Sequence, residues 1–368
     1  MHHDRSRLAL PDALRALALV SVLVVNAIGY AAAPWGTPLG RVIPPDGAWA
    51  QAVQGVVAAL LQGKGYTMLA FLFGMSLWLA TRSRSRTDAL RRGVVRQRRL
   101  LGLGVLHGVF VYFGDILTLY ALVGRRLLGR LHQPWHRFRR HWWLALGAAV
   151  VAKLLWLAMI AAYPEQPMAL DEPTLSSVEG GWAFLLLNAG VYALNLIPSV
   201  LLGGPVVYFC MACGVAAARL RLLTHRRWRP LLRRGVGWFG PPLLVLSALY
   251  GWGWATTEPL HPLRSGIEAL GELTSLPMAA VFVAALSLLS GGGRARWCAV
   301  LAPLGQRTLS LYVGHSLLGL ALFSGAGLAL LPTTPQMAAS ALGLWLLALG
   351  AAHLSGRRRW PLEAWMAR

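Results

Sequence analysis

The sequence predicts an all-α fold: a polytopic bundle of transmembrane helices with about ten spans and both termini in the cytoplasm. Hydrophobic residues make up 56% of the 368 residues and charged residues only 13%, about half the charged share of a soluble domain. The apolar residues fall into blocks of about 20 residues, the length of a helix that crosses a bilayer. Arginines gather between these blocks, as at 81–99 and 130–140, which is typical of cytoplasmic loops.

The net charge of +22 does not indicate a nucleic-acid partner, because the arginines are spread over short loops between apolar blocks. The partner that we expect for this surface is the lipid bilayer. The three cysteines lie in or beside apolar segments, and the C-x-x-C formed by Cys210 and Cys213 has no second ligand pair nearby. We therefore expect no metal site.

The first half of the chain supplies five apolar segments. The second of them is too long for one straight span, and we expect it to break at the glycines on either side of Lys64. The acidic, proline-bearing segment 164–181 follows the fifth and is expected to lie outside. The five segments are 14–33, 51–80, 100–113, 116–128 and 142–163.

The region 182–220 offers two hydropathy segments, 182–197 and 199–220, which Pro198 separates. Two crossings here would place the basic run 219–234 outside, and the positive-inside rule disfavours that arrangement. We expect one full span preceded by an interfacial or re-entrant piece.

The C-terminal part supplies the last four spans and then a basic "GRRRW" stretch, so the C-terminus is expected in the cytoplasm. We divide the chain into an N-terminal transmembrane region, 1–235, which carries the candidate polar site, and a C-terminal transmembrane region, 236–368. The last four spans are expected at 236–255, 268–289, 308–331 and 337–353.

Polar residues within the spans are the candidates for function, because ionisable groups in a membrane usually face an interior cavity. Arg15 begins the first span, and Asn26 follows eleven residues later, close to three helical turns or ~16 Å. The two side chains therefore share a face, with Arg15 at the cytoplasmic end and Asn26 in the outer half. The alternatives are an interface anchor for Arg15 and an interhelical hydrogen bond for Asn26.

Lys64, His107 and Asp115 are expected at a similar depth, and we name them as candidate catalytic residues. Eight residues separate His107 from Asp115, so the two share a face if their helix continues through Gly114. Lys64 and Asp115 can neutralise each other, which lowers the cost of burying both charges. A purely structural ion pair is the alternative.

Four residues are candidates for substrate binding: Arg15, Asn26, Tyr120 and His315. His315 lies on the inner half of a later span, where ordinary packing is the alternative. Tyr120 follows Asp115 in the same run.

Other charged residues and motifs carry less chemistry. Lys153 has no evident partner, and Glu268 and Glu272 are expected on a solvated helix edge. The sequence contains no Walker A motif, no G-x-G-x-x-G after a strand, no H-E-x-x-H and no G-x-S-x-G. ATP-driven transport and zinc-protease chemistry are therefore disfavoured, and we expect no bound cofactor.

Several segments resemble, in order and spacing, the YeiB-like family of bacterial membrane proteins, whose C-terminal half defines domain of unknown function 418. They are "LPDALRALALVSVLVVN", "GKGYTMLAFLFG", "RRLLGLGVLHGVFVYFGDILTLYALVG", "PLGQRTLSLYVGHSLLG" and "RRRWPLEAW". The resemblance spans nearly the whole chain. The sequence departs from it at Ala16, Gly65 and His315, where glycine, an aromatic residue and glutamine are usual.

The YeiB-like family is similar to a wider group of transmembrane acyltransferases, which includes the acyltransferase 3 family and the heparan glucosaminide N-acetyltransferases. Acyltransferase 3 proteins carry an arginine and, after ten intervening residues, a histidine. Here Arg15 is followed at that spacing by Asn26. The resemblance implies that Arg15 helps to bind the acyl donor, but an asparagine is no general base. His107 with Asp115 is the replacement that we expect.

The resulting prediction is a membrane-bound O- or N-acyltransferase of the bacterial cytoplasmic membrane. It would move an acyl group from a cytosolic donor such as acyl-CoA to an envelope glycan, lipid or metabolite. Lys64 would neutralise Asp115 or polarise the thioester carbonyl. A proton-coupled transporter or flippase is an alternative, because buried charges and glycine-broken helices also describe a carrier. A non-catalytic membrane partner of another enzyme is a third.

Overall fold

The computed structural model describes residues 5–31, 47–81, 85–162, 181–258, 261–291, 295–330, 332–356 and 358–367. Within these ranges the chain is helical and contains no strand, as the composition predicts. Residues 164–180 of the acidic segment expected outside lie beyond the described ranges.

The helices of the described ranges follow the order of the apolar blocks. They are α1 (Arg5–Ala31), α2 (Gly47–Leu60), α3 (Lys64–Thr81), α4 (Arg86–Phe110), α5 (Leu117–Leu128), α6 (Trp135–Ala162), α7 (Gly181–Pro198), η1 (Ser199–Gly203), α8 (Gly204–Leu220), η2 (Arg226–Trp228), α9 (Arg229–Thr256), α10 (Arg264–Leu289), α11 (Arg296–Gly305), α12 (Thr308–Phe323), α13 (Thr334–Leu354) and α14 (Pro361–Ala367).

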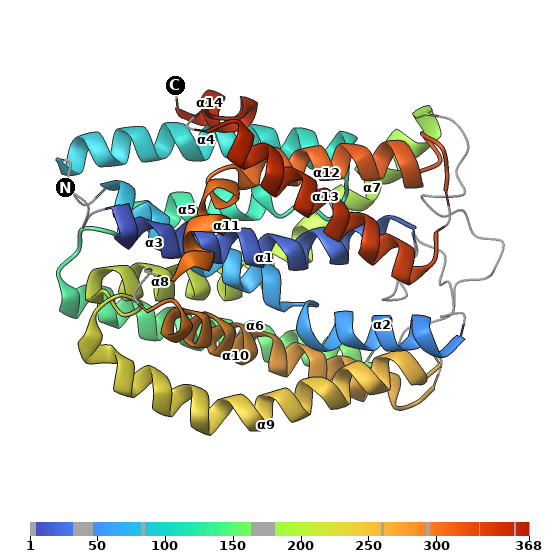
Figure 1. The fold of residues 1–368 in the computed structure, drawn as a ribbon, viewed down its shortest axis with the longest axis horizontal. Helices are drawn as coiled ribbons and strands as arrows, with labels where there is room; N and C mark the ends of the chain where they lie inside the picture. The colour runs from blue at the N-terminus through green and yellow to red at the C-terminus, as the bar shows by residue number, and fades with distance from the viewer. Residues whose placement is uncertain are drawn as a thin grey trace.

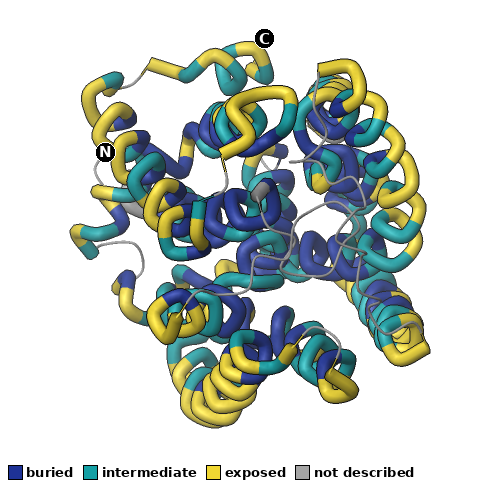
Figure 2. Tube along the Cα trace, turned by 90° about the vertical axis from the view of Figure 1, so that its right-hand side faces the viewer, coloured by how far each residue is buried: buried dark blue, intermediate teal, exposed yellow. Residues whose placement is uncertain are grey.

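The long helices run roughly along the longest axis of the molecule, and α1 lies among them (Figure 1). It packs against α3, α11, α12 and α13. Leu14, Leu19 and Leu23 of α1 are at most 1% exposed. A helix that is apolar all round is stable only where it is surrounded, which places α1 in the core. Figure 2 shows the same arrangement, with buried residues on the inner helix faces and exposed residues on the outer ones.

The predicted break beside Lys64 is confirmed. α2 ends at Leu60 and α3 begins at Lys64. Gly63 between them has a φ of 76°, a left-handed conformation that costs glycine little. At Gly65, an added Cβ would lie 2.5 Å from Oγ of Ser21 in α1. Only glycine allows α3 to approach α1 this closely.

The region 182–220 forms one continuous helical segment rather than two separate pieces. α7 ends at Pro198 and passes through the π-helical turn η1 into α8, so that Gly181–Leu220 is a single apolar segment of 40 residues. Proline and a π-helical turn both bend helices without reversing the chain.

Six helical segments of the described residues are long and apolar enough to cross a membrane. The chain is therefore a multi-pass helical membrane protein. α4 is not among the six because arginines occupy its first half, and α5 has only 12 residues. The six are Ala9–Tyr30, Gly47–Thr81, Trp135–Ala162, Gly181–Leu220, Arg264–Leu289 and Thr334–Leu354.

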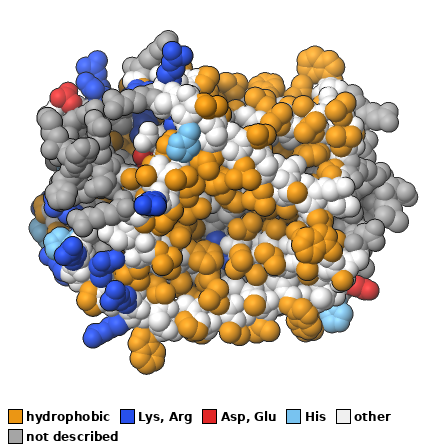
Figure 3. Space-filling view, in the orientation of Figure 1, with side chains coloured by type: hydrophobic (Ala, Val, Ile, Leu, Met, Phe, Trp, Pro, Cys, Tyr) orange, Lys and Arg blue, Asp and Glu red, His pale blue; other side chains and the backbone are white. Residues whose placement is uncertain are grey.

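The surface is divided as a bilayer environment requires. Large apolar side chains point outward, among them Leu154 on α6, Val245 on α9 and Leu347 on α13, which are 60%, 59% and 74% exposed. Figure 3 shows hydrophobic side chains across the middle of one face and Lys and Arg side chains gathered toward one end. We call this end the basic end; α3 and α8 finish there, and α4 and α9 begin there (Figure 1).

Candidate functional site

His107 and Asp115 meet across the turn between α4 and α5. The backbone N–H groups of Val111 and Tyr112 both donate to the His107 carbonyl, at 2.9 Å each, and α4 stops at Phe110. The shared helix face that the sequence predicts requires the helix to continue through Gly114, but α4 ends before this residue. Instead the turn carries Asp115 back toward His107.

Asp115 joins the start of α5 to the end of α4. Its Oδ2 accepts a hydrogen bond of 2.8 Å from the backbone N–H of Thr118 in the first turn of α5. Its Oδ1 lies 2.9 Å from Nδ1 of His107. The side chains of His107 and Asp115 are 1% and 0% exposed. A carboxylate held in this way fixes the orientation of the imidazole.

The second ring nitrogen of His107 is available for chemistry. Because ionised Asp115 only accepts, we assign the Nδ1 proton to the hydrogen bond between them. Nε2 then carries a lone pair, and it makes no hydrogen bond to any described residue. A histidine whose Nδ1 is oriented by a carboxylate and whose Nε2 is free has the arrangement of a general base.

Tyr312 of α12 covers this histidine. The two ring centroids are 5.1 Å apart, and Tyr312 is 4% exposed. Tyr312 also forms part of the wall of a cavity of about 620 Å³ near the basic end. The tyrosine ring therefore stands between His107 and the cavity.

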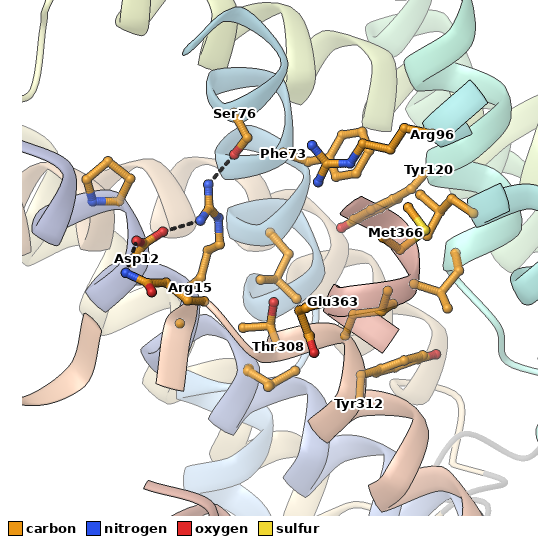
Figure 4. Close-up of a pocket in the computed structure, with 18 of the residues that line it drawn as sticks. Asp12, Arg15, Phe73, Ser76, Arg96, Tyr120, Thr308, Tyr312, Glu363 and Met366 are labelled. Atoms are coloured by element: carbon orange, nitrogen blue, oxygen red, sulfur yellow. Dashed lines mark hydrogen bonds and ion pairs between the residues drawn. The ribbon is translucent and has the colours of Figure 1, made fainter. Parts of the chain in front are cut away.

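The large cavity is lined by polar groups at the basic end and by apolar groups deeper in the bundle (Figure 4). Arg15 is held in it by Asp12 of the same helix and by the hydroxyl group of Ser76 on α3. Its polar and charged walls are formed by Asp12, Arg15, Ser76, Arg96, Gln306, Thr308, Arg359 and Glu363. Its apolar and aromatic walls include Leu19, Val22, Leu69, Phe73, Leu100, Ile116, Leu117, Tyr120 and Tyr312.

Three arginines line this cavity, and two of them, Arg15 and Arg96, come from long helices of the bundle. Arg15 comes from α1 and Arg96 from α4, and their charges act on each other. Asp12 balances Arg15, whereas no ion pair among the described residues joins Arg96 to a carboxylate. Two guanidinium groups facing one cavity favour an anionic ligand there.

The short helix α14 closes one side of the cavity. Oε1 of Glu363 accepts a hydrogen bond of 2.9 Å from the backbone N–H of Ser310 in the first turn of α12. Arg99 of α4 donates to the Trp365 carbonyl at 3.0 Å. These two contacts hold α14 between α4 and α12, with Met366 turned to the cavity.

Lys64 is not paired with Asp115 in the described structure. It is 1% exposed, and its Nζ lies 3.1 Å from the carbonyl oxygen of Ala58 and 5.2 Å from the ring centroid of Tyr250. Ala58 is in the last turn of α2, where carbonyl groups have no helical partner. The ammonium group therefore caps the C-terminus of α2 and complements its dipole.

The candidate substrate-binding residues lie in different places. Tyr120 lines the large cavity, as Arg15 does, with its ring 5.7 Å from Phe73, and donates to the Tyr66 carbonyl. Asn26 lines a second, smaller cavity. His315 is 5% exposed and is not among the described residues that line either cavity.

Several functional candidates were missed in the sequence. Arg96 lies among many arginines of one segment, and nothing in the spacing marks it as inward-facing. Tyr312 and Glu363 lie within segments that resemble the YeiB-like family, which is the signal that marks them. Lys153, which we expected to lack a partner, pairs with Glu272 of α10.

The helical fold, the apolar surface and the partly polar cavity together define the class: a multi-pass membrane protein with charged side chains in an internal cavity. Residues 217–366 match the model of a family described as "Protein of unknown function (DUF418)". This match supports the predicted resemblance to the YeiB-like family over these residues, and its range includes Tyr312, His315 and Glu363. Among curated proteins, no significant match is found.

Proposed function

We propose that this protein is an integral-membrane acyltransferase that moves an acyl group from a cytosolic donor such as acyl-CoA to a hydroxyl or amine group. The acceptor would be an envelope glycan, a lipid or a metabolite. One observation carries the proposal: the His107–Asp115 pair is packed behind Tyr312, whose ring lines the cavity that holds Arg15.

The proposed topology has about ten passes with both termini in the cytoplasm of a bacterial inner membrane. The direction of successive helices supports it, because α1, α2–α3, α4, α5 and α6 run alternately along the long axis (Figure 1). The basic end supports the orientation, since positively charged loops remain on the cytoplasmic side. The large cavity then opens toward the cytosolic donor.

Donor binding would use two of the three arginines that line the large cavity. Arg15 and Arg96 would contact the phosphate groups of the donor, which guanidinium groups bind strongly and with fixed geometry. The acyl chain would lie along the apolar wall formed by Leu19, Val22 and Leu69. The order of Arg15, Leu19 and Val22 along α1 would put the phosphate groups nearer the basic end and the acyl chain deeper in the bundle, on the side of Tyr312.

The transfer step would use His107 as the base. Nε2 of His107 takes the proton of the acceptor hydroxyl as its oxygen attacks the thioester carbonyl; the C–O bond forms and the C–S bond breaks. The proton then passes to the departing thiolate, so that no charge accumulates. Asp115 stabilises the imidazolium ion between these steps. Because Tyr312 covers His107, its ring must move aside for the reactants to meet.

Lipid and glycan extracts test this proposal in cells. Mass spectrometry is applied to extracts of wild-type cells, of a deletion strain, and of the deletion strain complemented with His107→Gln. We expect one species to lose the mass of one acyl group in the deletion strain and in the variant. If extracts of the three strains are identical, the acyltransferase proposal is wrong.

A second candidate function, proton-coupled transport, is favoured by one separate observation. Lys153 of α6 pairs with Glu272 of α10, and the Glu272 charge also acts on buried Lys64 of α3. Three charged groups shared by three helices within a membrane are also typical of a proton-coupled carrier. Substrate movement into vesicles without any acylated product would favour this second function.

A further inference from the structure

A second cavity, of about 160 Å³, lies beyond the large one along α1. α1 contributes Pro11 to Val22 to the large cavity and Ser21 to Asn26 to the small one. At ~1.5 Å per residue, this places the small cavity one to two turns farther from the basic end. Three residues, Val22, Ile116 and Tyr312, line both cavities.

The size of the small cavity limits what it holds. An apolar cavity of about 150 Å³ in a protein core accommodates one benzene molecule. A cavity of about 160 Å³ is therefore matched to a group of the size of one six-membered ring. The glycines at 63, 65 and 114 form part of its wall, so that backbone replaces side chains there.

The chemistry of the wall limits the ligand further. No charged side chain is among the described residues that line the small cavity. Most of the wall is aliphatic or aromatic. The polar side chains among the described lining residues are Ser21, Asn26, Tyr66 and Tyr312, and Asn26 alone of these carries an amide. The hydroxyl group of Ser21 already donates to the Leu61 carbonyl at 2.6 Å. An amide facing an apolar cavity is stabilised by a ligand that hydrogen-bonds to it.

We infer that the small cavity is a separate binding site for an uncharged, mostly apolar group that carries one hydroxyl, with Asn26 as its hydrogen-bond partner. The two cavities thus differ in charge. Arginines line the large cavity, and no charged side chain is among the described residues that line the small one.

The position of the small cavity relates it to the His107–Asp115 pair. Gly114 and Ile116, the neighbours of Asp115 in the chain, both line it. Tyr312, which lines it from the other side, lies against His107. This step rests on the proposed function: the hydroxyl group of the ligand is then the acyl acceptor. It attacks the thioester from the small cavity when the Tyr312 ring moves.

Fluorine NMR with para-fluorophenol tests the site directly. The probe is titrated into the purified full-length protein in lipid nanodiscs, and empty nanodiscs correct for partition into lipid. We expect a saturable bound signal. Val25→Phe, which fills the cavity, should abolish it. Asn26→Leu should weaken para-fluorophenol binding by about tenfold, the effect of one hydrogen bond, while para-fluorotoluene binding stays unchanged.

Three results would overturn the inference. The first is the lack of a saturable signal with the wild-type protein. The second is binding of para-fluorobenzoate with the same affinity as para-fluorophenol, and the third is para-fluorophenol binding that both variants retain. The two variants act by different means, so failure of one to fold leaves the other as a test; unfolding temperatures identify such a failure. Binding without acyl transfer would keep this site and reject the acyltransferase proposal. Acyl transfer that Val25→Phe retains would reject the acceptor site alone.

Discussion

The ammonium group of Lys64 donates a hydrogen bond to the carbonyl group of Ala58, with 3.1 Å between Nζ and O. The lysine stands at the first residue of α3 and caps the last turn of α2. A basic residue between two glycines in an apolar run is explained by this contact: the glycines break the helix, and the lysine satisfies the end that the break creates. This contact gives Lys64 a structural role in the described chain, and its catalytic role stays a prediction.

Replacing Lys64 with Met is expected to destabilise the protein. The Ala58 carbonyl would lose its partner inside the bundle, which costs about 1–3 kcal/mol. Thermal unfolding in detergent measures the change, and Lys64→Arg should recover part of it. A Lys64→Met protein of wild-type stability that lacks acyl transfer would contradict the structural role and favour the catalytic one.

Gly65→Ala is expected to disturb the contact of α3 with α1. The new Cβ would lie 2.5 Å from Oγ of Ser21 and 3.0 Å from the Ala18 carbonyl oxygen. Overpacking of this kind costs about 1–3 kcal/mol. Gly102→Ala is the matched control, because nothing lies within 4 Å of its added Cβ. Equal unfolding temperatures for the two variants would contradict the close packing.

Asp115→Asn is expected to lower acyl transfer with little loss of stability. The asparagine side chain still accepts from the Thr118 N–H, whereas the charge that stabilises the His107 imidazolium is lost. We expect the single-turnover rate to fall about 10²–10⁴-fold. Unfolding temperature is the control. A rate within a factor of two or so of wild type would exclude Asp115 from the mechanism.

Arg96→Gln is expected to weaken donor binding. The large cavity would lose one anion-binding group. We expect KM for acyl-CoA to rise about tenfold and to depend less on salt concentration. Arg98→Gln serves as the control, because Arg98 is exposed two residues away on α4. The same KM in both variants would show that Arg96 does not meet the donor.

The parts of the fold that depend on composition and local pattern were predicted correctly from the sequence. The all-helical membrane class follows from apolar blocks, and the break beside Lys64 follows from its glycines. The partner of Lys64 was missed because a buried charge can be satisfied by a backbone carbonyl, which leaves no pattern. Arg96 was missed because its inward direction depends on how α4 packs.

The meeting of His107 with Asp115 was expected for a reason that the structure corrects. An eight-residue spacing suggests a shared helix face, but α4 ends at Phe110 and the following turn supplies the contact. Turn geometry depends on packing around Gly114, where an added Cβ would meet the Tyr112 ring at 2.7 Å. The contact of Tyr312 with His107 was not predicted because it joins residues distant in the chain.

Transfer of label from isotopically labelled acyl-CoA tests the central claim most directly. Purified wild-type protein and His107→Ala, in vesicles that contain lipid and glycan extract, are compared at equal folded amounts. We predict labelled acceptor with the wild type and none above background with His107→Ala, at similar unfolding temperatures. Equal labelling by the two proteins would contradict the assignment of His107 as the base, and no labelling by either would contradict acyl transfer itself.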